Sequence, residues 1–545
     1  MKLSDRSLQD RALWEKTGVE LPRFDRASVI AKTRAAPQWL HFGTGNIFRA
    51  FLADLSQRLL DSGDADTGII AAAPYDTETI DAVYRPYDNL GILAVLKTGK
   101  PFWRVLASVT ETLAADPSGE DWRRLTEVFC APSLQMVSFT VTEKGYATND
   151  THGGLLPAVE ADCQEGPGAP ATLLGKLAAL CYARYCSVGA GEPPPLALVS
   201  MDNCSQNGDR LRDGVLLVSR AWEKHGFVPP EFSAWLEDPR RVSFPWTMID
   251  KITPRPDETI RAALEAAGLE GMNITRTKKN TWIAPFVNAE EWGCLVIEDA
   301  FPNGRPPLEK AGALFADRET VDRVERMKVG ACLNPLHTAL AVYGCLLGYT
   351  SIHEEMNDPA LHALVTRLGY DECLPAVVSP GIIDPGEFLR QVLEERFPNP
   401  FIPDTPQRIA CDTSQKLPVR LGGALKSWLR RRPGAEMEPL VAIPLVYAGW
   451  CRYLMGIDDQ GNPFEPSPDP LLPRLRAVVE GIGLGGAPSA AEAVERLRPI
   501  LSDSALFGVN LYEAGLAERV AAYFTELRAG PGAVRNTLRK YVKGE

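Results

Sequence analysis

The spacing of apolar residues predicts alternating strands and helices in the first half of the chain. The segment 47–60 has helical periodicity and turns its large apolar side chains to one face. Short apolar runs that predict strands are 38–42, 67–73, 102–109, 134–141 and 196–200. Alternation of this kind is typical of a mostly parallel sheet covered by helices, so we expect an α/β domain of Rossmann type.

The second half has a different pattern, with few strand signals. Long segments of helical periodicity are separated by Pro and Gly, at 335–348, 358–368, 385–396, 417–431, 440–456, 470–482 and 490–501. The turn-rich segment 301–307 lies near the change and is a candidate link between the two halves. We therefore expect an α/β domain over 1–317 and a mainly α-helical domain over 318–545.

Composition and charge narrow the class of protein. The 545 residues are 45% hydrophobic and 23% charged, which is ordinary for a globular protein. The net charge of -12 argues against nucleic acid or an anionic membrane as the main partner, although a local cationic pocket can still bind a small anion. No apolar leader or membrane span is visible, which predicts a cytoplasmic protein. The 11 scattered cysteines have no zinc-ligand spacing and predict reduced thiols and no metal site.

A glycine turn follows the first predicted strand, as Gly43-Thr44-Gly45-Asn46. Strand, glycine turn and helix together form the geometry in which backbone N–H groups approach the pyrophosphate of a dinucleotide. The third glycine of the usual fingerprint is absent, and Phe48 and Arg49 occupy that region. The turn therefore predicts a dinucleotide site, with an ordinary strand-to-helix turn as the alternative.

Asp76 follows the second predicted strand, where an acidic residue can bind the ribose hydroxyls of a dinucleotide. In that role its carboxylate would repel a 2′-phosphate, which favours NAD over NADP. The alternative interpretation is that Asp76 is only the N-cap of the next helix.

The segment 328–337 gathers groups suited to carbonyl reduction, namely Lys328, Asn334 and His337. Hydride addition to a ketone builds negative charge on its oxygen, and each fixed amide donor typically stabilises that charge by a few kcal/mol. A lysine can deliver the proton near neutral pH only if its pKa is lowered from about 10.4 by burial or by nearby cations. The alternatives are a surface lysine, a core histidine and an Asn that caps the helix begun by Pro335.

Seven motifs in fixed order make the chain resemble a known family. They lie at 42–49, 140–146, 200–203, 244–254, 296–299, 328–337 and 414–418. The sequence is similar to the polyol-specific long-chain dehydrogenases, which include mannitol 2-dehydrogenase, fructuronate reductase and tagaturonate reductase. The resemblance covers most of the chain. It implies an NAD(P)-dependent, metal-independent enzyme whose active site lies between a Rossmann-type domain and an α-helical domain.

The resemblance also implies roles for individual residues. Hydride would pass between nicotinamide C4 and a secondary alcohol or ketone carbon of an open-chain sugar derivative, with Lys328 as general acid/base and Asn203 and Asn334 polarising the oxygen. Matching positions imply substrate contacts by His337, Asp250, Arg408 and Lys416, and proton exchange with solvent through Glu325. The cofactor-binding residues expected are Gly43, Gly45, Asn46, Ile47, Asp76 and Glu143.

The chain departs from the family in the spacing between Lys328 and Asn334. The family usually has four intervening residues, whereas this sequence has Val329, Gly330, Ala331, Cys332 and Leu333. On a straight helix, the extra residue would put Lys328 about 180° from His337, on opposite faces. We therefore predict a local bulge or break between Gly330 and Pro335.

The substrate expected first is fructuronate, reduced to mannonate. The turn Gly43-Thr44-Gly45-Asn46 is closer to the hexuronate-reductase branch, and Arg408 can grip a carboxylate through paired hydrogen bonds. Tagaturonate reduction and mannitol or arabinitol oxidation are the alternatives. A non-catalytic dinucleotide-binding sensor is a further alternative, favoured only by the spacing at Lys328. The partner expected is a small sugar acid or polyol, and the protein is expected to be a monomer or a small homo-oligomer.

Overall fold

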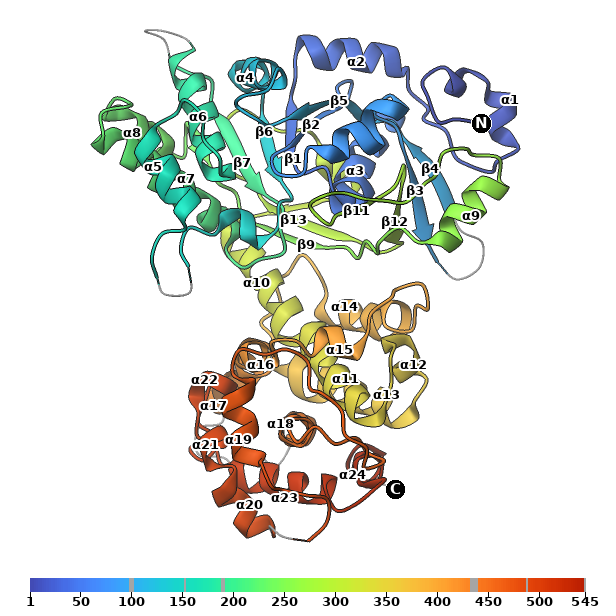
Figure 1. Ribbon diagram of the computed structural model, residues 1–545, viewed down its shortest axis with the longest axis vertical. Coiled ribbons are helices and arrows are strands. Elements are labelled where there is room, and N and C mark those ends of the chain that lie inside the picture. Colours follow the sequence, from blue (N-terminus) through green and yellow to red (C-terminus); the bar gives the residue numbers. More distant parts are fainter. Residues whose placement is uncertain (98–101, 151–152, 188–191, 432–439, 487–488, 544–545) are drawn as a thin grey trace. The chain divides into compact units, whose positions relative to one another are not determined.

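The structure is a computed structural model that describes residues 1–97, 102–150, 153–187, 192–431, 440–486 and 489–543. The chain divides into two compact units, Met1–Asp322 and Arg323–Glu545, and the division falls within helix α10 (Arg318–Met327). In the described residues every strand belongs to the first unit (Figure 1). The α/β first half and the helical second half predicted from the sequence are thus confirmed.

A six-stranded sheet forms the centre of the first unit, in the order β5-β2-β1-β6-β7-β8. Every neighbouring pair in it is parallel, as predicted. Its strands are β1 (Trp39–Phe42), β2 (Ile69–Ala73), β5 (Val109–Ala114), β6 (Met136–Phe139), β7 (Leu196–Ser200) and β8 (Val242–Ser243). The chain order reverses between β1 and β6, which makes their ends a topological switch point.

Successive side chains of β1 pack on opposite faces of this sheet. Leu40 and Phe42 belong to one apolar cluster, and Trp39 belongs to the cluster on the other side. His41 is fully buried, and burial lowers its pKa to about 3, so the ring is neutral at physiological pH. Its Nδ1 lies 2.7 Å from the hydroxyl oxygen of Ser138 on β6. The alternation of side chains along β1 therefore fixes how this strand pairs with its neighbours at the centre of the sheet.

The helices of the first unit in part cover the two faces of the sheet and in part pack in a separate apolar cluster. They are α1 (Arg11–Glu15), α2 (Arg26–Ala35), α3 (Ala53–Ser62), α4 (Asp121–Cys130), α5 (Pro157–Glu165), α6 (Leu173–Cys186), α7 (Asn207–Lys224), α8 (Glu231–Glu237) and α9 (Glu258–Ala266), with short turns η1 (Ser7–Gln9), η3 (Ile80–Tyr84), η4 (Arg85–Tyr87), η5 (Glu143–Tyr146) and η6 (Leu308–Ala311). The predicted helix 47–60 is confirmed, but a π turn, η2 (Phe48–Leu52), forms its beginning.

Two predictions for the first unit need correction. The run 102–109 is two strands rather than one, because β4 (Phe102–Leu106) pairs antiparallel with β3 (Gly91–Leu96) while β5 joins the parallel sheet. The segment 301–307 does not leave the unit, because β14 (Leu314–Ala316) follows it and pairs with β13 (Cys294–Glu298). The remaining strands are β9 (Thr247–Asp250), β10 (Thr275–Arg276), β11 (Trp282–Ile283) and β12 (Phe286–Glu290).

The second unit is helical and packs around the buried helix α11 (Asn334–Leu347). The other helices are α12 (Ile352–Met356), α13 (Pro359–Arg367), α14 (Pro385–Gln391), α15 (Pro406–Ile409), α16 (Thr413–Arg420), α17 (Gly422–Arg431), α18 (Ala442–Tyr453), α19 (Leu472–Val479), α20 (Ala490–Arg496), α21 (Arg498–Leu501), α22 (Ser504–Phe507), α23 (Ala517–Leu527) and α24 (Ala533–Leu538), with turns η7 (Lys328–Cys332), η8 (Leu368–Cys373), η9 (Leu374–Ala376), η10 (Val392–Arg396) and η11 (Arg539–Lys543). The predicted helix 417–431 is divided between α16 and α17.

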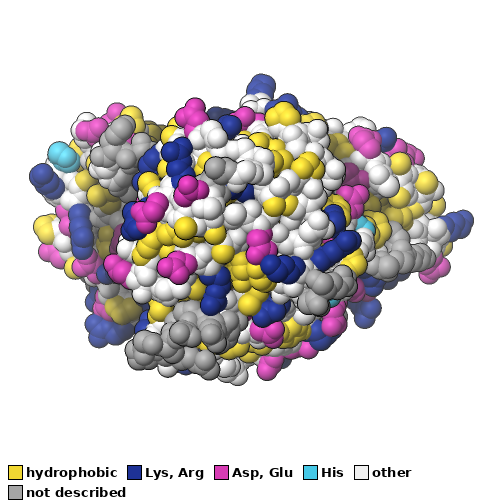
Figure 2. All heavy atoms as spheres, turned by 90° about the horizontal axis from the view of Figure 1, so that it is seen from below, with side chains coloured by type: hydrophobic (Ala, Val, Ile, Leu, Met, Phe, Trp, Pro, Cys, Tyr) yellow, Lys and Arg dark blue, Asp and Glu magenta, His cyan; other side chains and the backbone are white. Residues whose placement is uncertain are grey.

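The stretch Arg318–Leu347 has the length and apolar content of a membrane span. However, 78% of its most apolar window is buried within the structure, as in the core helix of a globular protein. On the face drawn in Figure 2, Lys and Arg are interspersed with Asp and Glu, and neither sign forms a continuous patch. All eleven cysteines are free thiols, in agreement with the sequence prediction.

A buried carboxylic acid lies against the last turn of α11. Glu355 on α12 is fully buried, and burial raises the pKa of its carboxyl to about 9. Neither side-chain oxygen finds a hydrogen-bond partner among the described residues. Gly344 leaves the space that this side chain fills, since a Cβ there would lie 2.0 Å from Glu355 Oε1. The carboxyl is therefore protonated at neutral pH, because no nearby group compensates its charge.

We expect Glu355→Gln to stabilise the protein increasingly as the pH rises. The folded state keeps a proton that the unfolded state releases above about pH 4.3, so the wild type loses roughly 1.4 kcal/mol per pH unit up to the folded pKa. The amide carries no such penalty. The gain in Tm over the wild type should be small at pH 5 and large at pH 8, whereas the exposed control Glu354→Ala should show no trend. A difference in Tm that is constant with pH would contradict this assignment.

Candidate functional site

Most of the predicted site residues of the first unit follow strands of the parallel sheet at one edge. Because all six strands run in the same direction, their carboxyl ends share that edge. The segment 43–46 follows β1, Asp76 follows β2, Glu143 follows β6 and Asn203 follows β7. Open sheets of this kind bind ligands outside the carboxyl ends of the strands, at the switch point.

Gly43 occupies the switch point in a conformation that other residues rarely adopt. Its φ is +124°, and a Cβ there would lie 2.3 Å from the carbonyl oxygen of Thr140, which follows β6. By contrast, a Cβ on Gly45 would meet nothing within 4 Å, and that glycine does not have a positive φ. Gly43 is therefore required by the fold of the turn, whereas the space beside Gly45 is open.

The helix that follows the turn begins at Asn46 and Ile47 and continues through the π turn η2. Asn46 Oδ1 and Asp76 Oδ1 are both buried, and neither finds a hydrogen-bond partner within the described part of the chain. Asp76 Oδ2 accepts a hydrogen bond of 2.6 Å from the hydroxyl of Thr277. No described backbone N–H donates to this carboxylate, so the contacts do not support the N-cap alternative. A bound ligand can satisfy both orphaned oxygens.

One carboxylate connects the loops that follow β6 and β7. Asp202 accepts hydrogen bonds from the backbone N–H groups of Val141 (2.9 Å) and Thr142 (2.8 Å) and from the hydroxyl of Tyr146 (2.6 Å). Burial raises the pKa of Asp202, although these donors oppose the shift. The adjacent Asn203 is exposed on the first unit's surface. Asp202 thus anchors the loop that carries this predicted catalytic amide.

Two further predicted residues of the first unit lie in defined environments. Glu143 is exposed and pairs with Arg210 at 2.5 Å. Asp250 ends β9, is 7% exposed and lies opposite Cys294 in the antiparallel pair with β13. The roles suggested for these two carboxylates remain predictions.

In the second unit, the predicted bulge is present. Residues Lys328–Cys332 form a π turn, and the N–H of Leu333 donates to the carbonyl oxygen of Lys328 at 3.1 Å, five residues earlier. Leu333 then departs from helical geometry, with φ -127° and ψ -63°. Helix α11 begins at Asn334 with Pro335 in its first turn. The prediction of a local bulge or break is confirmed, and the bulge begins two residues earlier than expected.

The π turn changes which side chains share a face. A π turn absorbs one residue relative to an α turn, so the angle from Lys328 to His337 falls from about 180° to roughly 80°. Asn334 and His337 are three residues apart on α11 and lie on one face. Lys328 is 2% exposed, so its amine is not in bulk solvent. Glu325 lies three residues before Lys328 on α10 and is partly buried.

His337 lies beside a carboxylate that the sequence did not single out. Its Nε2 is 3.4 Å from Asp404 Oδ2, although the two groups are not aligned as a hydrogen bond. Asp404 also pairs with Arg408, whose side chain is 65% exposed. Burial lowers the pKa of His337 and outweighs the opposing effect of Asp404. Burial raises the pKa of Asp404, but His337 and Arg408 outweigh it and leave a net lowering.

Two cations on α16 have different partners. Lys416 donates to the backbone carbonyl oxygens of Ile409 (3.0 Å) and Cys411. Arg420, one turn further along α16, donates from Nη1 to Thr338 Oγ1 at 2.9 Å. Burial lowers the pKa of Lys416, and the charge of Arg420 lowers it further. Asp404 thus links His337 and Arg408, whereas Lys416 contacts the backbone at the end of α15, and the substrate contacts expected of these residues stay predictions.

Sequence reasoning missed Arg420, Asp404 and Asp202. Helical spacing offered a signal for the first two, because Arg420 lies four residues after Lys416 and Asp404 lies four residues before Arg408. Asp202 was visible only as the neighbour of Asn203, and its hydrogen bonds bridge about sixty residues of sequence. Such a bridge cannot be read from local spacing.

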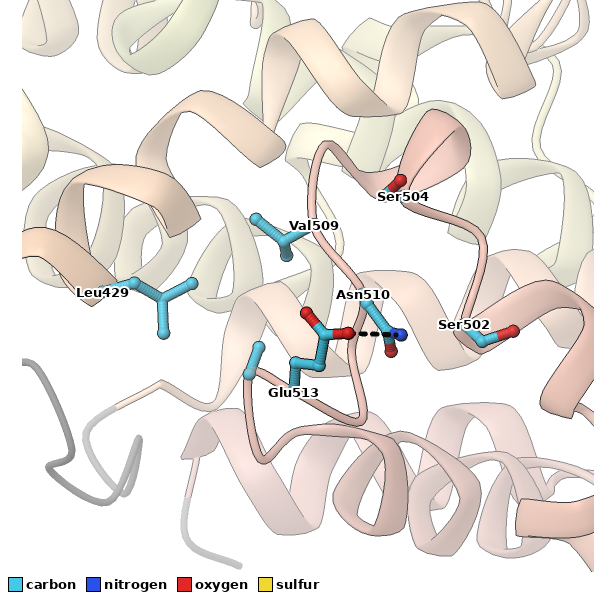
Figure 3. A pocket seen from close by; sticks show the side chains of 7 residues that line it. Leu429, Ser502, Ser504, Val509, Asn510 and Glu513 are labelled. Atoms are coloured by element: carbon cyan, nitrogen blue, oxygen red, sulfur yellow. Dashed lines mark hydrogen bonds between the residues drawn. The ribbon is translucent and has the colours of Figure 1, made fainter.

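A separate hollow of about 370 Å³ lies on the second unit, between the end of α17 and the loops around α22 (Figure 3). It is lined by Leu429, Ser502, Ser504, Val509, Asn510, Glu513 and Ala514. Within it Asn510 donates to Glu513 at 3.2 Å. None of the predicted site residues lines this hollow. Among the described residues, no group of three or more His, Cys, Asp or Glu side chains is arranged to hold a metal ion.

Comparisons with known proteins agree with the division of the chain into an α/β unit and a helical unit. The mannitol dehydrogenase Rossmann domain matches residues 37–310, and the mannitol dehydrogenase C-terminal domain matches residues 320–528. The chain belongs to the mannitol dehydrogenase family. The family expected from the ordered motifs is thereby confirmed.

Among its relatives is D-mannonate oxidoreductase of Thermotoga maritima, which is 51% identical over 548 residues and covers 100% of both chains. Mannitol 2-dehydrogenase of Aspergillus fumigatus is 29% identical, with 99% of each chain covered. A solved structure of Pseudomonas fluorescens mannitol 2-dehydrogenase, a ternary complex with NAD and D-mannitol, is similar with a TM-score of 0.70, 27% identity and full coverage of both chains. This member of the mannitol dehydrogenase family therefore shares both domains with proteins named as sugar-alcohol or sugar-acid oxidoreductases.

The two glycines of the turn should respond differently to the same substitution. We expect Gly43→Ala to lower the Tm and to abolish NADH binding, because the new methyl group collides with the backbone of residue 140. Gly45→Ala should leave the Tm of the free protein unchanged but weaken NADH binding at least tenfold, since only an approaching ligand would meet its methyl group. Thermal unfolding and NADH fluorescence titration measure both effects. Unchanged NADH affinity in Gly45→Ala would exclude close approach of the cofactor at this position.

Proposed function

We propose that this protein is an NAD-dependent oxidoreductase that interconverts D-fructuronate and D-mannonate. The observation that carries the proposal is the π turn at Lys328, which brings a buried amine into register with Asn334 and His337. The 51% identity with a D-mannonate oxidoreductase over the whole chain supports this substrate pair. The charges of Arg420 and Arg408, which both lower the pKa of His337, also suit a sugar acid better than a neutral polyol.

The first unit fits a dinucleotide. A Cβ on Gly45 would meet nothing within 4 Å, so a ligand can approach the start of the helix there, which suits a pyrophosphate. Asp76 would accept hydrogen bonds from the ribose hydroxyls through its orphaned Oδ1, and the same carboxylate would repel the extra phosphate of NADP. Ile47 and Glu143 would complete the contacts. NAD(H), when bound, supplies or accepts the hydride at the substrate carbon.

The residues of the second unit would handle the proton and the developing charge. As hydride adds to the ketone carbon of fructuronate, the C–O double bond becomes a single bond and its electron pair moves to oxygen. Asn334 and Asn203 would donate hydrogen bonds to that oxygen, and Lys328 would give it a proton. Glu325 would return a proton from solvent to Lys328. The products are mannonate and the oxidised cofactor, and the reverse reaction uses the same groups.

Other residues would hold the substrate. Neutral His337 can donate or accept a hydrogen bond with a substrate hydroxyl, while Asp250, Arg408 and Lys416 would contact the remainder of the sugar chain. Fructuronate and mannonate belong to general carbohydrate metabolism, so we place the protein in the cytoplasm. A monomer or small homo-oligomer remains our expectation for the assembly.

Replacing the amine tests the mechanism. We expect Lys328→Ala to lower kcat for fructuronate reduction by at least 10³-fold at every pH while NADH still binds, because proton transfer typically contributes 10²–10⁴-fold and the charge is also lost. Lys426→Ala on α17 is the matched control, since that lysine is exposed, and it should keep wild-type turnover. NADH absorbance followed at several pH values measures both. Wild-type turnover in Lys328→Ala would end the proposal.

Side-by-side kinetics with the wild type test the substrate. Fructuronate should give a higher kcat/KM than tagaturonate, fructose or the ketose of arabinitol, and mannonate should be oxidised with NAD in preference to NADP. Faster reduction of tagaturonate or of a neutral ketose would replace fructuronate as the substrate. Binding of NADH without turnover of any of these compounds would identify a sensor rather than an enzyme.

A further inference from the structure

Arg420 is a cation of the second unit for which no described residue supplies a carboxylate partner. Its guanidinium is partly buried, and the hydroxyl of Thr338 at 2.9 Å is its one protein partner among the described residues. Burial alone lowers its pKa to about 10, so it still carries its charge at neutral pH. Partial burial of a guanidinium that has a single neutral partner costs free energy, and a bound anion would offset that free energy.

The position of Arg420 places this charge beside the residues proposed for chemistry. Thr338, which accepts its hydrogen bond, donates in turn to the backbone carbonyl of Asn334 at 3.0 Å and follows His337 directly. The charge of Arg420 lowers the pKa of His337 and also that of Lys416. Arg420 thus lies within one helical turn of the residues expected to hold the sugar.

The other cations nearby are already engaged. Arg408 pairs with Asp404 and is largely exposed, so a carboxylate bound there would compete with an internal one. Lys416 donates to two backbone carbonyls and holds the end of α15. The guanidinium of Arg420 keeps donors that no described residue occupies, in the planar arrangement that matches a carboxylate.

We propose that Arg420, rather than Arg408, binds the carboxylate of the sugar acid and so determines the preference for a hexuronate over a neutral polyol. This inference rests on the proposed function and assigns the substrate's acidic end to one residue. The ketone lies at the opposite end of the fructuronate chain from the carboxylate, and the carboxylate would bind the N–H groups of Arg420 that Thr338 does not occupy. Thr338 acts as a positioning residue that holds the guanidinium in place.

The test compares Arg420→Met with Arg408→Met and with the exposed control Arg430→Met. We expect Arg420→Met to raise the KM for fructuronate roughly 10- to 100-fold with kcat changed less than fivefold, which is the effect of losing a charged hydrogen-bond pair. Arg420→Lys should recover part of the loss, and Thr338→Val should give a smaller rise in KM. The increase in Tm on adding D-mannonate with NAD should also disappear in Arg420→Met, and Arg430→Met should behave as the wild type in both assays.

The outcomes separate this inference from the proposed function. If the wild type reduces fructuronate but Arg420→Met keeps its KM, or if Arg408→Met raises the KM as much or more, the carboxylate assignment is wrong and the function stands. A loss of kcat and of Tm without ligand in Arg420→Met, not recovered by Arg420→Lys, would show a structural role and also overturn the assignment. If the wild type reduces only neutral ketoses, the proposed function itself fails.

Discussion

The contact on which the candidate site depends is a single hydrogen bond, from the N–H of Leu333 to the carbonyl oxygen of Lys328. It closes a π turn that takes up one residue more than the family spacing allows. Without it, the helix from α10 into α11 would carry the amine of Lys328 to the face opposite His337. The π turn therefore takes up the extra residue in the backbone. Lys328 keeps the angular position relative to Asn334 and His337 that it would have with the family spacing.

A second constraint is the balance of charge around α11. Asp404 lies against both His337 and Arg408, and the pKa of its own carboxyl is lowered by them. Arg420 donates to Thr338 on α11, and burial lowers its pKa. Among the described residues no carboxylate pairs with Arg420, whereas Arg408 pairs with Asp404 and Lys416 donates to two backbone carbonyls. An anionic ligand is the natural complement to the guanidinium of Arg420.

The periodicity of apolar residues predicted those parts of the fold in which the local sequence pattern matches the strand pairing in the structure. The strand 196–200 was predicted with its observed bounds, since it is a short buried run in a parallel sheet. The run 102–109 was predicted as one strand because apolar content does not reveal that its two ends pair in different sheets. At the candidate site, an unusual spacing in the sequence was enough to predict the bulge after Lys328. The contact between Asp76 and Thr277 spans 201 residues and could not be predicted.

The bridge made by Asp202 has a consequence for motion in the first unit. Both of its oxygens hold the loop after β6, while its own backbone belongs to the loop after β7. If the loop after β6 moves, the loop after β7 must therefore move with it, or three hydrogen bonds must break. Glu143 and Asn203 lie on these two loops, so the carboxylate proposed to bind the dinucleotide and the amide proposed to face the sugar would move together.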